Sequence, residues 1–177
     1  MRIAVVVTLL ALSGLLFETS AQKVIGPSIK NFGKVNDNYF RGAQPNRSQI
    51  AALKAMGVKT IIDLRRDSIP QEPAWAKERG LRYFNLRLKS HQHASEEQSK
   101  TFLRLVNDPT NFPVFVHCRG GKHRTGAMTA IYRITHDGWT AQQAFDEMQK
   151  YHFDAGIEIG PPDQKRFVFE FYEKWKK

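Results

Sequence analysis

The spacing of hydrophobic positions changes repeatedly along the chain between that of strands and that of helices. Polar residues at 36–38 separate Val35 from the apolar pair Tyr39 and Phe40, which predicts a hairpin. The β-branched run at 58–64 predicts a buried strand. Further strands are expected at 81–88, where apolar and polar residues alternate loosely, and at 113–117.

Helix boundaries are marked by capping residues and glycines. Asn46 with Gln49, and Thr140 with Gln143, have the spacing of a capping box, while Ser95 and Asp163 are good N-cap residues. Helices are therefore predicted after Asn46, Ser95, Thr140 and Asp163, and over 72–78 and 124–136, with stops at Gly57, Gly80 and Gly138 and near 108–109. Strands that alternate with helices indicate an α/β sandwich around a largely parallel sheet.

The first 21 residues are typical of a secretory signal peptide. Arg2 precedes an apolar run at 3–17, and small residues follow at 19–21, where a signal peptidase would cut. The run is shorter than the roughly 20 residues that a membrane-spanning helix needs. We expect a periplasmic or secreted protein with a single domain at 22–177 and no stable membrane insertion after cleavage. The alternative is an uncleaved N-terminal anchor.

Composition restricts the class of protein and raises a question about its partner. The chain has 177 residues, of which 41% are hydrophobic, and a single cysteine, which excludes a disordered chain and a disulfide-stapled one. Its 27 Lys and Arg against 17 Asp and Glu give a net charge of +10. Such a charge favours an anionic partner, which leaves nucleic acid, a membrane surface or a phosphorylated substrate open.

Residues that carry chemistry gather at 113–126, where the last predicted strand meets a helix. Cys118 follows the strand, and Gly120 and Gly121 allow positive φ in the loop behind it. Backbone N–H groups of such a loop, together with a helix N-terminus, form a cradle for a phosphate-sized anion. The same helix N-terminus and the nearby Arg124 favour the thiolate of Cys118.

These residue types suit transfer of a phosphoryl group. The Cys118 thiolate would attack phosphorus, and the planar guanidinium of Arg124 would hold two phosphoryl oxygens. Thr125 has two readings, as a hydroxyl donor to the sulfur or as an N-cap of the following helix. His117 is expected to be structural and to bond the loop backbone. The sequence has no compact spacing of metal ligands, so no metal or other cofactor is predicted.

The segment 117–126 resembles the signature loop of the cysteine-dependent protein tyrosine phosphatase superfamily. The wider pattern is similar to atypical dual-specificity phosphatases of plants, fungi and bacteria, through 31–32, 39–42, 117–126, Trp139, 145–147, 163–164 and Phe167. The resemblance implies a three-layer fold with about five strands, Cys118 as the phosphocysteine nucleophile and Arg124 as the phosphate clamp. The phosphate-binding residues implied are Arg119, Gly120, Gly121, Lys122, His123 and Arg124.

The general acid departs from the pattern that the resemblance implies. Many members carry an Asp roughly thirty residues before the nucleophile, but 85–98 holds none. His91 has the best spacing for this role, and His93, Glu96, Glu97 and Asp63 are the other candidates. Without an acid, aryl phosphates and phosphoanhydrides would be better substrates than alkyl phosphates, because their leaving groups need little protonation.

The predicted function is hydrolysis of phosphate esters, with phosphotyrosine and dual-specificity substrates expected. One alternative is an inositol pyrophosphate phosphatase with the same mechanism, since Arg119, Lys122 and His123 would suit a highly anionic small molecule. Another is a pseudophosphatase that only binds phosphorylated ligands. A nucleic-acid binder is suggested by the charge alone and is not expected. An arsenate reductase would need further cysteines, which the chain lacks.

Overall fold

The structure is a computed structural model that describes residues 27–90, 92–153 and 162–177. Its elements are β1 (Gly33–Asn36), β2 (Tyr39–Ala43), α1 (Arg47–Ala55), β3 (Thr60–Arg65), α2 (Gln71–Glu78), β4 (Arg82–Leu88), α3 (Glu96–Asn107), a short 3-10 turn (Pro109–Asn111), β5 (Val114–Cys118), α4 (His123–His136), α5 (Ala141–Lys150) and α6 (Pro162–Trp175). The predicted signal peptide and His91 lie outside the described residues.

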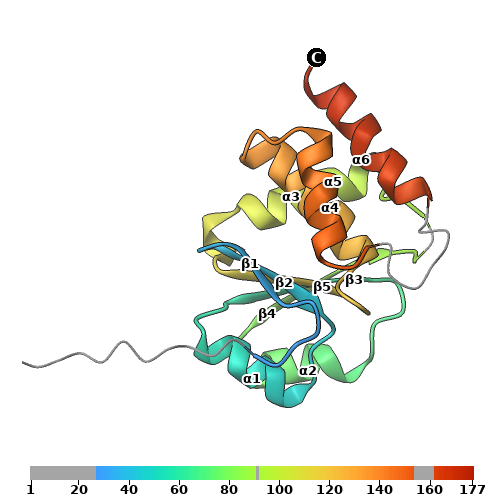
Figure 1. The fold of residues 1–177 in the computed structure, drawn as a ribbon. Coiled ribbons are helices and arrows are strands. Elements are labelled where there is room, and N and C mark those ends of the chain that lie inside the picture. The colour runs from blue at the N-terminus through green and yellow to red at the C-terminus, as the bar shows by residue number, and fades with distance from the viewer. Residues whose placement is uncertain (1–26, 91, 154–161) are drawn as a thin grey trace, which may run out of the picture.

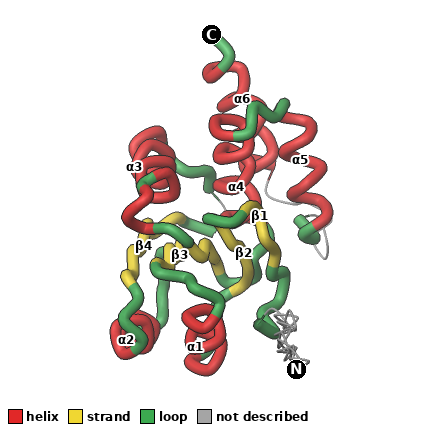
Figure 2. The backbone as a smooth tube through the Cα atoms, turned by 90° about the vertical axis from the view of Figure 1, so that its left-hand side faces the viewer, coloured by secondary structure: helices red, strands yellow, loops and turns green. Residues whose placement is uncertain are grey.

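A single five-stranded sheet forms the middle layer, in the order β1-β2-β5-β3-β4. Among the described strands, β1 alone runs antiparallel to its neighbour, because β1 and β2 form the predicted hairpin, and β2, β5, β3 and β4 are parallel. Helices α1 and α2 lie against one face, and α3, α4, α5 and α6 lie on the other (Figures 1 and 2). The predicted three-layer α/β fold with a largely parallel sheet is therefore confirmed.

Alternating residues of the central strand β5 divide the core between the two faces of the sheet. Phe115 packs with Ile50 and Leu53 under α1, whereas Val116 packs with Met128 of α4 on the opposite face. Full burial of such a side chain contributes about 1.5–3 kcal/mol to folding. Because both faces of the sheet are covered, β5 is buried throughout. Packing of the strand therefore fixes the position of Cys118 at its carboxyl end.

Helix α4 is buried between the sheet and two further helices. A third apolar cluster joins α4 to α5 and α6 through Ala130, Phe145 and Val168. Ten of the 14 residues of α4 are buried, beginning with Arg124, so this helix, which follows the Cys118 loop, is packed on several sides. Its start is therefore set by packing along its length.

The predicted helix caps are largely those observed. Asn46, Ser95 and Thr140 each form a capping box, in which the cap side chain accepts a bond from the N–H three residues on. Helix α6 begins at Pro162, one residue before the predicted cap Asp163, so Asp163 belongs to its first turn. Proline at this position lacks only an N–H that a helix start leaves unpaired.

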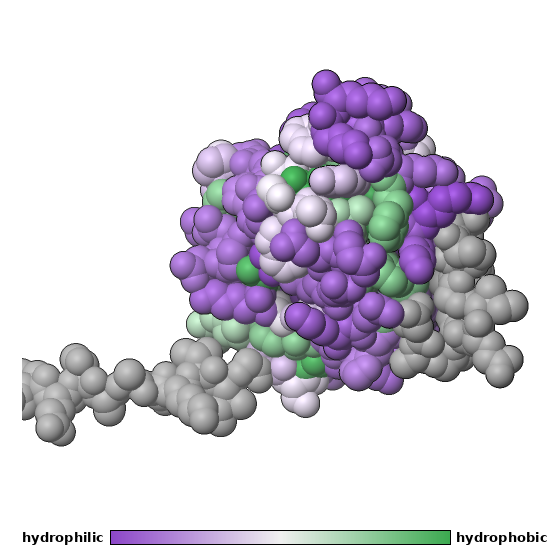
Figure 3. Space-filling view, turned by 45° about the horizontal axis from the view of Figure 1, so that its top comes forward, coloured by the Kyte–Doolittle hydropathy of each residue, from purple (hydrophilic) through white to green (hydrophobic). Residues whose placement is uncertain are grey.

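Hydrophilic residues cover most of the face of the molecule seen in Figure 3. Trp175, near the end of α6, is 56% exposed and stands out among the described residues as a large exposed hydrophobic side chain. None of the helices in the described part of the chain is long and apolar enough to cross a membrane.

Candidate active site

Cys118 occupies the carboxyl end of the central strand β5. It pairs with Ala43 of β2 in the sheet and is 3% exposed. A four-residue loop then leads to His123, where α4 begins. The predicted arrangement of strand, loop and helix is present, and the helix N-terminus adjoins the sulfur-bearing strand end.

The loop rests directly on the backbone of β2, and Gly121 makes this possible. Its φ is +68°, and a Cβ there would lie 2.5 Å from the carbonyl carbon of Gly42. Gly120 does not use the conformational freedom that was expected of both glycines: it is not among the residues with positive φ, and the nearest atom to a Cβ there would be the Lys122 Cγ at 3.8 Å. Close approach of two backbones therefore requires a glycine at one of these positions only.

One side chain from the turn before β1 and one from β2 hold the loop in place. The Asn31 amide donates to the Gly120 carbonyl at 2.7 Å, and the Arg41 guanidinium donates from Nη2 to the Gly121 carbonyl at 2.8 Å. Asn31 has a positive φ of 54°, a conformation that asparagine tolerates better than most residues. Both residues belong to the motif that carries the resemblance, but sequence reasoning assigned them no role.

Arg41 places a buried positive charge behind the loop. Its side chain is fully buried, and its guanidinium carbon lies 3.8 Å from the ring centroid of Tyr151. Its Nε and Nη1 have no hydrogen-bond partner among the described residues. Burial lowers the pKa of Arg41, while electrostatic interactions with Tyr39, Glu147 and Cys118 oppose the shift. No described carboxylate forms an ion pair with Arg41, so its buried guanidinium favours anionic groups nearby, such as the Cys118 thiolate.

Arg124 lies in the first turn of α4 and is almost buried, at 8% exposure. Its Nη1 donates to the carbonyl oxygen of Leu88, at the end of β4, at 3.1 Å. This bond uses one N–H of the guanidinium and leaves its other donors for a ligand. The structure thus fixes the residue predicted to clamp a phosphate by attaching it to a neighbouring strand.

The remaining predicted phosphate-binding residues differ in their surroundings. Arg119 is exposed and Lys122 is half-buried. The ring of His123 lies edge-on to Phe153, and its Nε2 is 2.6 Å from the Phe153 carbonyl oxygen. We infer that His123 supports the loop and contributes its backbone N–H at the start of α4.

Thr125 is not the N-cap of α4. The cap position is taken by Lys122, whose side chain makes no capping bond, and Thr125 lies in the first turn. The Thr125 hydroxyl is buried, and none of the residues that the structure describes forms a hydrogen bond with it. This excludes the capping role and leaves the hydroxyl free for the other predicted role, as a donor to sulfur.

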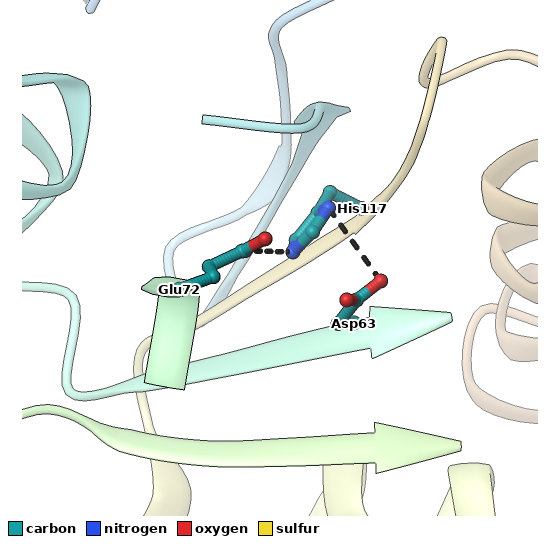
Figure 4. A group of neighbouring side chains, drawn as sticks. All are labelled: Asp63, Glu72 and His117. Atoms are coloured by element: carbon teal, nitrogen blue, oxygen red, sulfur yellow. Dashed lines mark ion pairs between the residues drawn. The ribbon is translucent and has the colours of Figure 1, made fainter. Parts of the chain in front are cut away.

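His117 faces carboxylates and not the loop backbone, contrary to the sequence-based expectation. Its Nε2 lies 2.7 Å from a Glu72 carboxylate oxygen and its Nδ1 lies 3.9 Å from Asp63 (Figure 4). All three side chains are fully buried on the α2 side of the sheet, where the His117 ring also stacks on Phe115. Neither ring nitrogen is aligned for a hydrogen bond, so the contact is one of charge and proximity.

Asp63, Glu72 and His117 have ligand atoms within 4.8 Å of one another, a spacing that would suit a metal ion. However, Nη2 of Arg65 lies 2.9 Å from both carboxylates and already supplies a positive charge there. Burial raises the pKa of Asp63, but hydrogen bonds from Arg65 and Tyr83 and the charge of His117 outweigh it, and the net pKa is lowered. The cluster is best described as a buried ion-pair network beneath the loop.

Two candidates for the general acid are engaged elsewhere. Asp63 accepts hydrogen bonds from the Arg65 backbone N–H and guanidinium, so its carboxylate is already occupied by Arg65. Glu96 is 81% exposed in the first turn of α3 and pairs with Lys100, whose hydrogen bond lowers the pKa of Glu96. Neither carboxyl is poised to donate a proton at the loop.

The loop between β4 and α3 retains the histidine candidates. The ring of His93 stacks on Phe167 at 5.8 Å, and its Nδ1 lies 3.0 Å from the Ala94 carbonyl oxygen. Glu97 is exposed in the first turn of α3. His91 remains a prediction from its spacing alone.

Solved structures share this fold. The crystal structure of TpbA from Pseudomonas aeruginosa aligns with a TM-score of 0.68 and 28% identity, over 85% of this chain and 93% of that one. The catalytic domain of the yeast phosphatase Siw14 aligns with a TM-score of 0.68 over 79% of this chain and 84% of that one, at 23% identity. The latter likeness supports the fold alone.

Sequence comparison and a family model agree on the assignment. The dual specificity protein phosphatase TpbA of P. aeruginosa is 30% identical over 146 residues, which are 82% of this chain and 64% of that protein. Inositol diphosphatase DSP2 of Oryza sativa is 30% identical over 140 residues, covering 76% and 67%. The chain spans 58–67% of the length of these first relatives. Residues 26–161 match the family described as "DSP-PTPase phosphatase fused to NAD+ Kinase", and the chain belongs to this family of dual-specificity phosphatases.

Proposed function

We propose that this chain is a cysteine-dependent phosphatase that hydrolyses phosphate esters, phosphotyrosine among them. The observation that carries the proposal is the position of Cys118, at the end of the central strand, with Arg124 in the first turn of the following helix. Cys118 and Arg124, with five residues between them, also belong to the segment that resembles the phosphatase signature loop. The structure of TpbA with phosphotyrosine bound has a similar fold, at 26% identity and a TM-score of 0.69.

The reaction has two steps. In the first, the Cys118 thiolate attacks phosphorus, an S–P bond forms, the P–O bond to the leaving group breaks, and the leaving oxygen takes a proton. In the second, water attacks the phosphocysteine, the S–P bond breaks, and inorganic phosphate leaves. Arg124 and the N–H groups of the loop 119–123 stabilise the charge that builds on the phosphoryl oxygens.

The leaving group decides how much the first step depends on an acid. His91 is the proposed donor by its spacing, and His93 is the alternative. The carboxylates of Asp63 and Glu96 are paired with cations, and Glu97 is exposed to solvent. Imidazolium groups are common general acids in enzymes. We expect aryl phosphates and phosphoanhydrides to react faster than phosphoserine.

A second candidate function is hydrolysis of inositol pyrophosphates by the same mechanism. It is favoured by the excess of positive charge around the loop and by relatives named as inositol diphosphatases. A third candidate is a non-catalytic protein that binds phosphorylated ligands, which the presence of both Cys118 and Arg124 argues against.

A substrate panel tests these candidates. Phosphotyrosine peptide, phosphoserine peptide and an inositol pyrophosphate are compared with the native protein, Cys118→Ser and Arg124→Lys. We expect turnover that Cys118→Ser abolishes and that Arg124→Lys lowers by at least about 1000-fold, because lysine lacks the planar fork. Turnover that survives in Cys118→Ser would overturn the mechanism, and binding without turnover by the native protein would favour the non-catalytic candidate.

We further propose that the protein acts outside the cytoplasm after residues 1–21 are removed, as a periplasmic or secreted domain of residues 22–177. Supporting it are the Arg2 n-region, the apolar run at 3–17 and the small residues at 19–21. Mass spectrometry of protein recovered from cell fractions should find a chain that begins at Gln22. A chain that keeps its first 21 residues and stays with the membrane would favour the anchor instead.

A further inference from the structure

The carboxyl end of β4 contains an irregularity beside the loop of Cys118. In the pairing with β3, Asp63 aligns with Asn85 but Arg65 aligns with Leu88, so β4 carries one extra residue. Arg87 lies in this bulge with a φ of 53°, the left-handed conformation that costs energy for a residue with a side chain. Bulges next to active sites often redirect a side chain, and here the redirected side chain is an arginine.

The bulge is connected to the phosphate clamp through one carbonyl group. The carbonyl oxygen of Leu88 accepts a bond from Arg124 Nη1 at 3.1 Å and another from the Arg66 backbone N–H at 3.1 Å. The Leu88 side chain is 3% exposed, which fixes this position. The residues on either side of Leu88 are therefore held at a constant place relative to Arg124.

An open pocket of about 590 Å³ lies at this point. Its lining includes the cations Arg66, Arg87 and Lys89. Gln92 and His93 from the loop before α3, and Ser95 and Gln98 at the start of that helix, complete the described lining, which includes no acidic residue. Concave surfaces of one charge sign concentrate counter-ions of the opposite sign. The pocket is thus suited to an anion with several charges.

None of these three cations forms an ion pair with a described residue. Exposed cations elsewhere on the surface do, as in the pairs Arg47 with Glu78 and Lys100 with Glu96. Like charges held close together repel one another, and a strained backbone adds a cost. A bound anion would offset both.

We propose that Arg66, Arg87 and Lys89 form a second anion subsite, which binds a further phosphoryl group of a polyphosphorylated small molecule while its scissile phosphate lies in the Cys118 loop. The inference rests on the proposed function and adds a substrate class to it. A phosphoryl group fits better than a peptide carboxylate, because a phosphate accepts bonds from several cations at once and carries about two charges.

The test compares inhibitors that differ in the number of phosphoryl groups. Hydrolysis of an aryl monophosphate by the full chain is inhibited with inorganic phosphate and with tripolyphosphate, and the two inhibition constants are measured. The variant combines Arg66→Gln, Arg87→Asn and Lys89→Gln, with asparagine at 87 because it tolerates the left-handed backbone. The control combines Lys54→Gln, Lys77→Gln and Arg79→Gln, which removes the same charge from the α1 and α2 side of the sheet.

We expect the inhibition constant of tripolyphosphate to be at least about tenfold higher in the variant than in the native protein. The inhibition constant of inorganic phosphate and the KM of the aryl monophosphate should stay within about twofold of the native values. The control should leave all of them within about twofold. Equal weakening by the control, or an unchanged constant for tripolyphosphate, would overturn the subsite.

An acidic phosphotyrosine peptide and a neutral one provide a further arm. If the variant raises the KM of the acidic peptide alone and leaves tripolyphosphate unaffected, the subsite serves peptides and the proposal is wrong. The proposed function fails separately, because it predicts turnover of the aryl monophosphate by the native protein whatever the pocket binds.

Discussion

Nη2 of Arg41 donates a hydrogen bond to the carbonyl oxygen of Gly121 at 2.8 Å and so joins the second strand to the loop that follows Cys118. The two residues are 80 positions apart in the sequence, and both are buried. The bond fixes the position of the loop relative to the sheet and places the buried positive charge of Arg41 next to the loop. Loop shape and loop charge therefore depend on the same side chain.

Arg41→Met should impair both properties. The Gly121 carbonyl would lose its partner, which costs about 1–3 kcal/mol of unfolding free energy, and the loop would lose a nearby cation. We expect kcat/KM for an aryl phosphate to fall at least about tenfold. Alkylation of Cys118 by iodoacetamide, followed as a function of pH, should require a higher pH than in the native protein. An unchanged alkylation profile would show that the charge of Arg41 does not act on the thiol.

Gly121→Ala and Gly120→Ala form a matched pair. The first places a Cβ 2.5 Å from the Gly42 carbonyl carbon at a φ of +68°, and the second meets nothing closer than the Lys122 Cγ at 3.8 Å. We expect Gly121→Ala to lower kcat/KM by at least about 100-fold, because the loop N–H groups move, and Gly120→Ala to change it by about twofold at most. Steady-state kinetics with an aryl phosphate measure both. Equal effects of the two changes would contradict the close contact.

Thr125→Val tests the buried hydroxyl. Because this hydroxyl has no hydrogen-bond partner, its removal should leave thermal stability within about 0.5 kcal/mol. If the hydroxyl assists the sulfur as a leaving group, breakdown of the phosphocysteine slows by about tenfold and the intermediate accumulates. A stopped-flow burst of the released phenol, close to one equivalent of enzyme, would report this. Thr125→Ser keeps the hydroxyl and should behave like the native protein, and a normal kcat in Thr125→Val would exclude the role.

Asp63→Asn should destabilise the protein by about 3–5 kcal/mol at neutral pH, because it leaves the buried Arg65 with less counter-charge. The pKa of Asp63 is lowered in the fold, so its stabilisation is present above the ordinary aspartate pKa and is lost as the pH falls through the lowered value. Urea unfolding between pH 3 and pH 7 should show a weaker pH dependence in the variant. An identical dependence would mean that Asp63 is not a source of acid sensitivity.

Interactions between neighbouring residues were predictable from the sequence. Asn46, Ser95 and Thr140 cap helices through bonds to residues three positions away, so the pattern that predicts them also contains their partners. The strand at 113–117 and the loop after it were recognised for the same reason, since a short buried strand, glycines and a helix start follow one another. The chemistry of Cys118 and Arg124 was inferred from this local order.

Contacts between residues that are far apart in the sequence could not be predicted from local patterns. His117 was expected to bond the adjacent loop, yet the sheet and α2 bring Glu72 and Asp63 to it, and no local pattern encodes that meeting. Arg124 is held by Leu88, 36 residues earlier, and Thr125 lost its capping role because α4 starts at His123.

The helices, the strands and the position of Cys118 at a strand end were predictable from the sequence, because these features depend on side chains a few positions apart. The strand order, the loop's supports and the subsite at Arg87 depend on how two faces of a sheet are covered. These arrangements depend on how the whole core packs, so they are visible only in the tertiary structure.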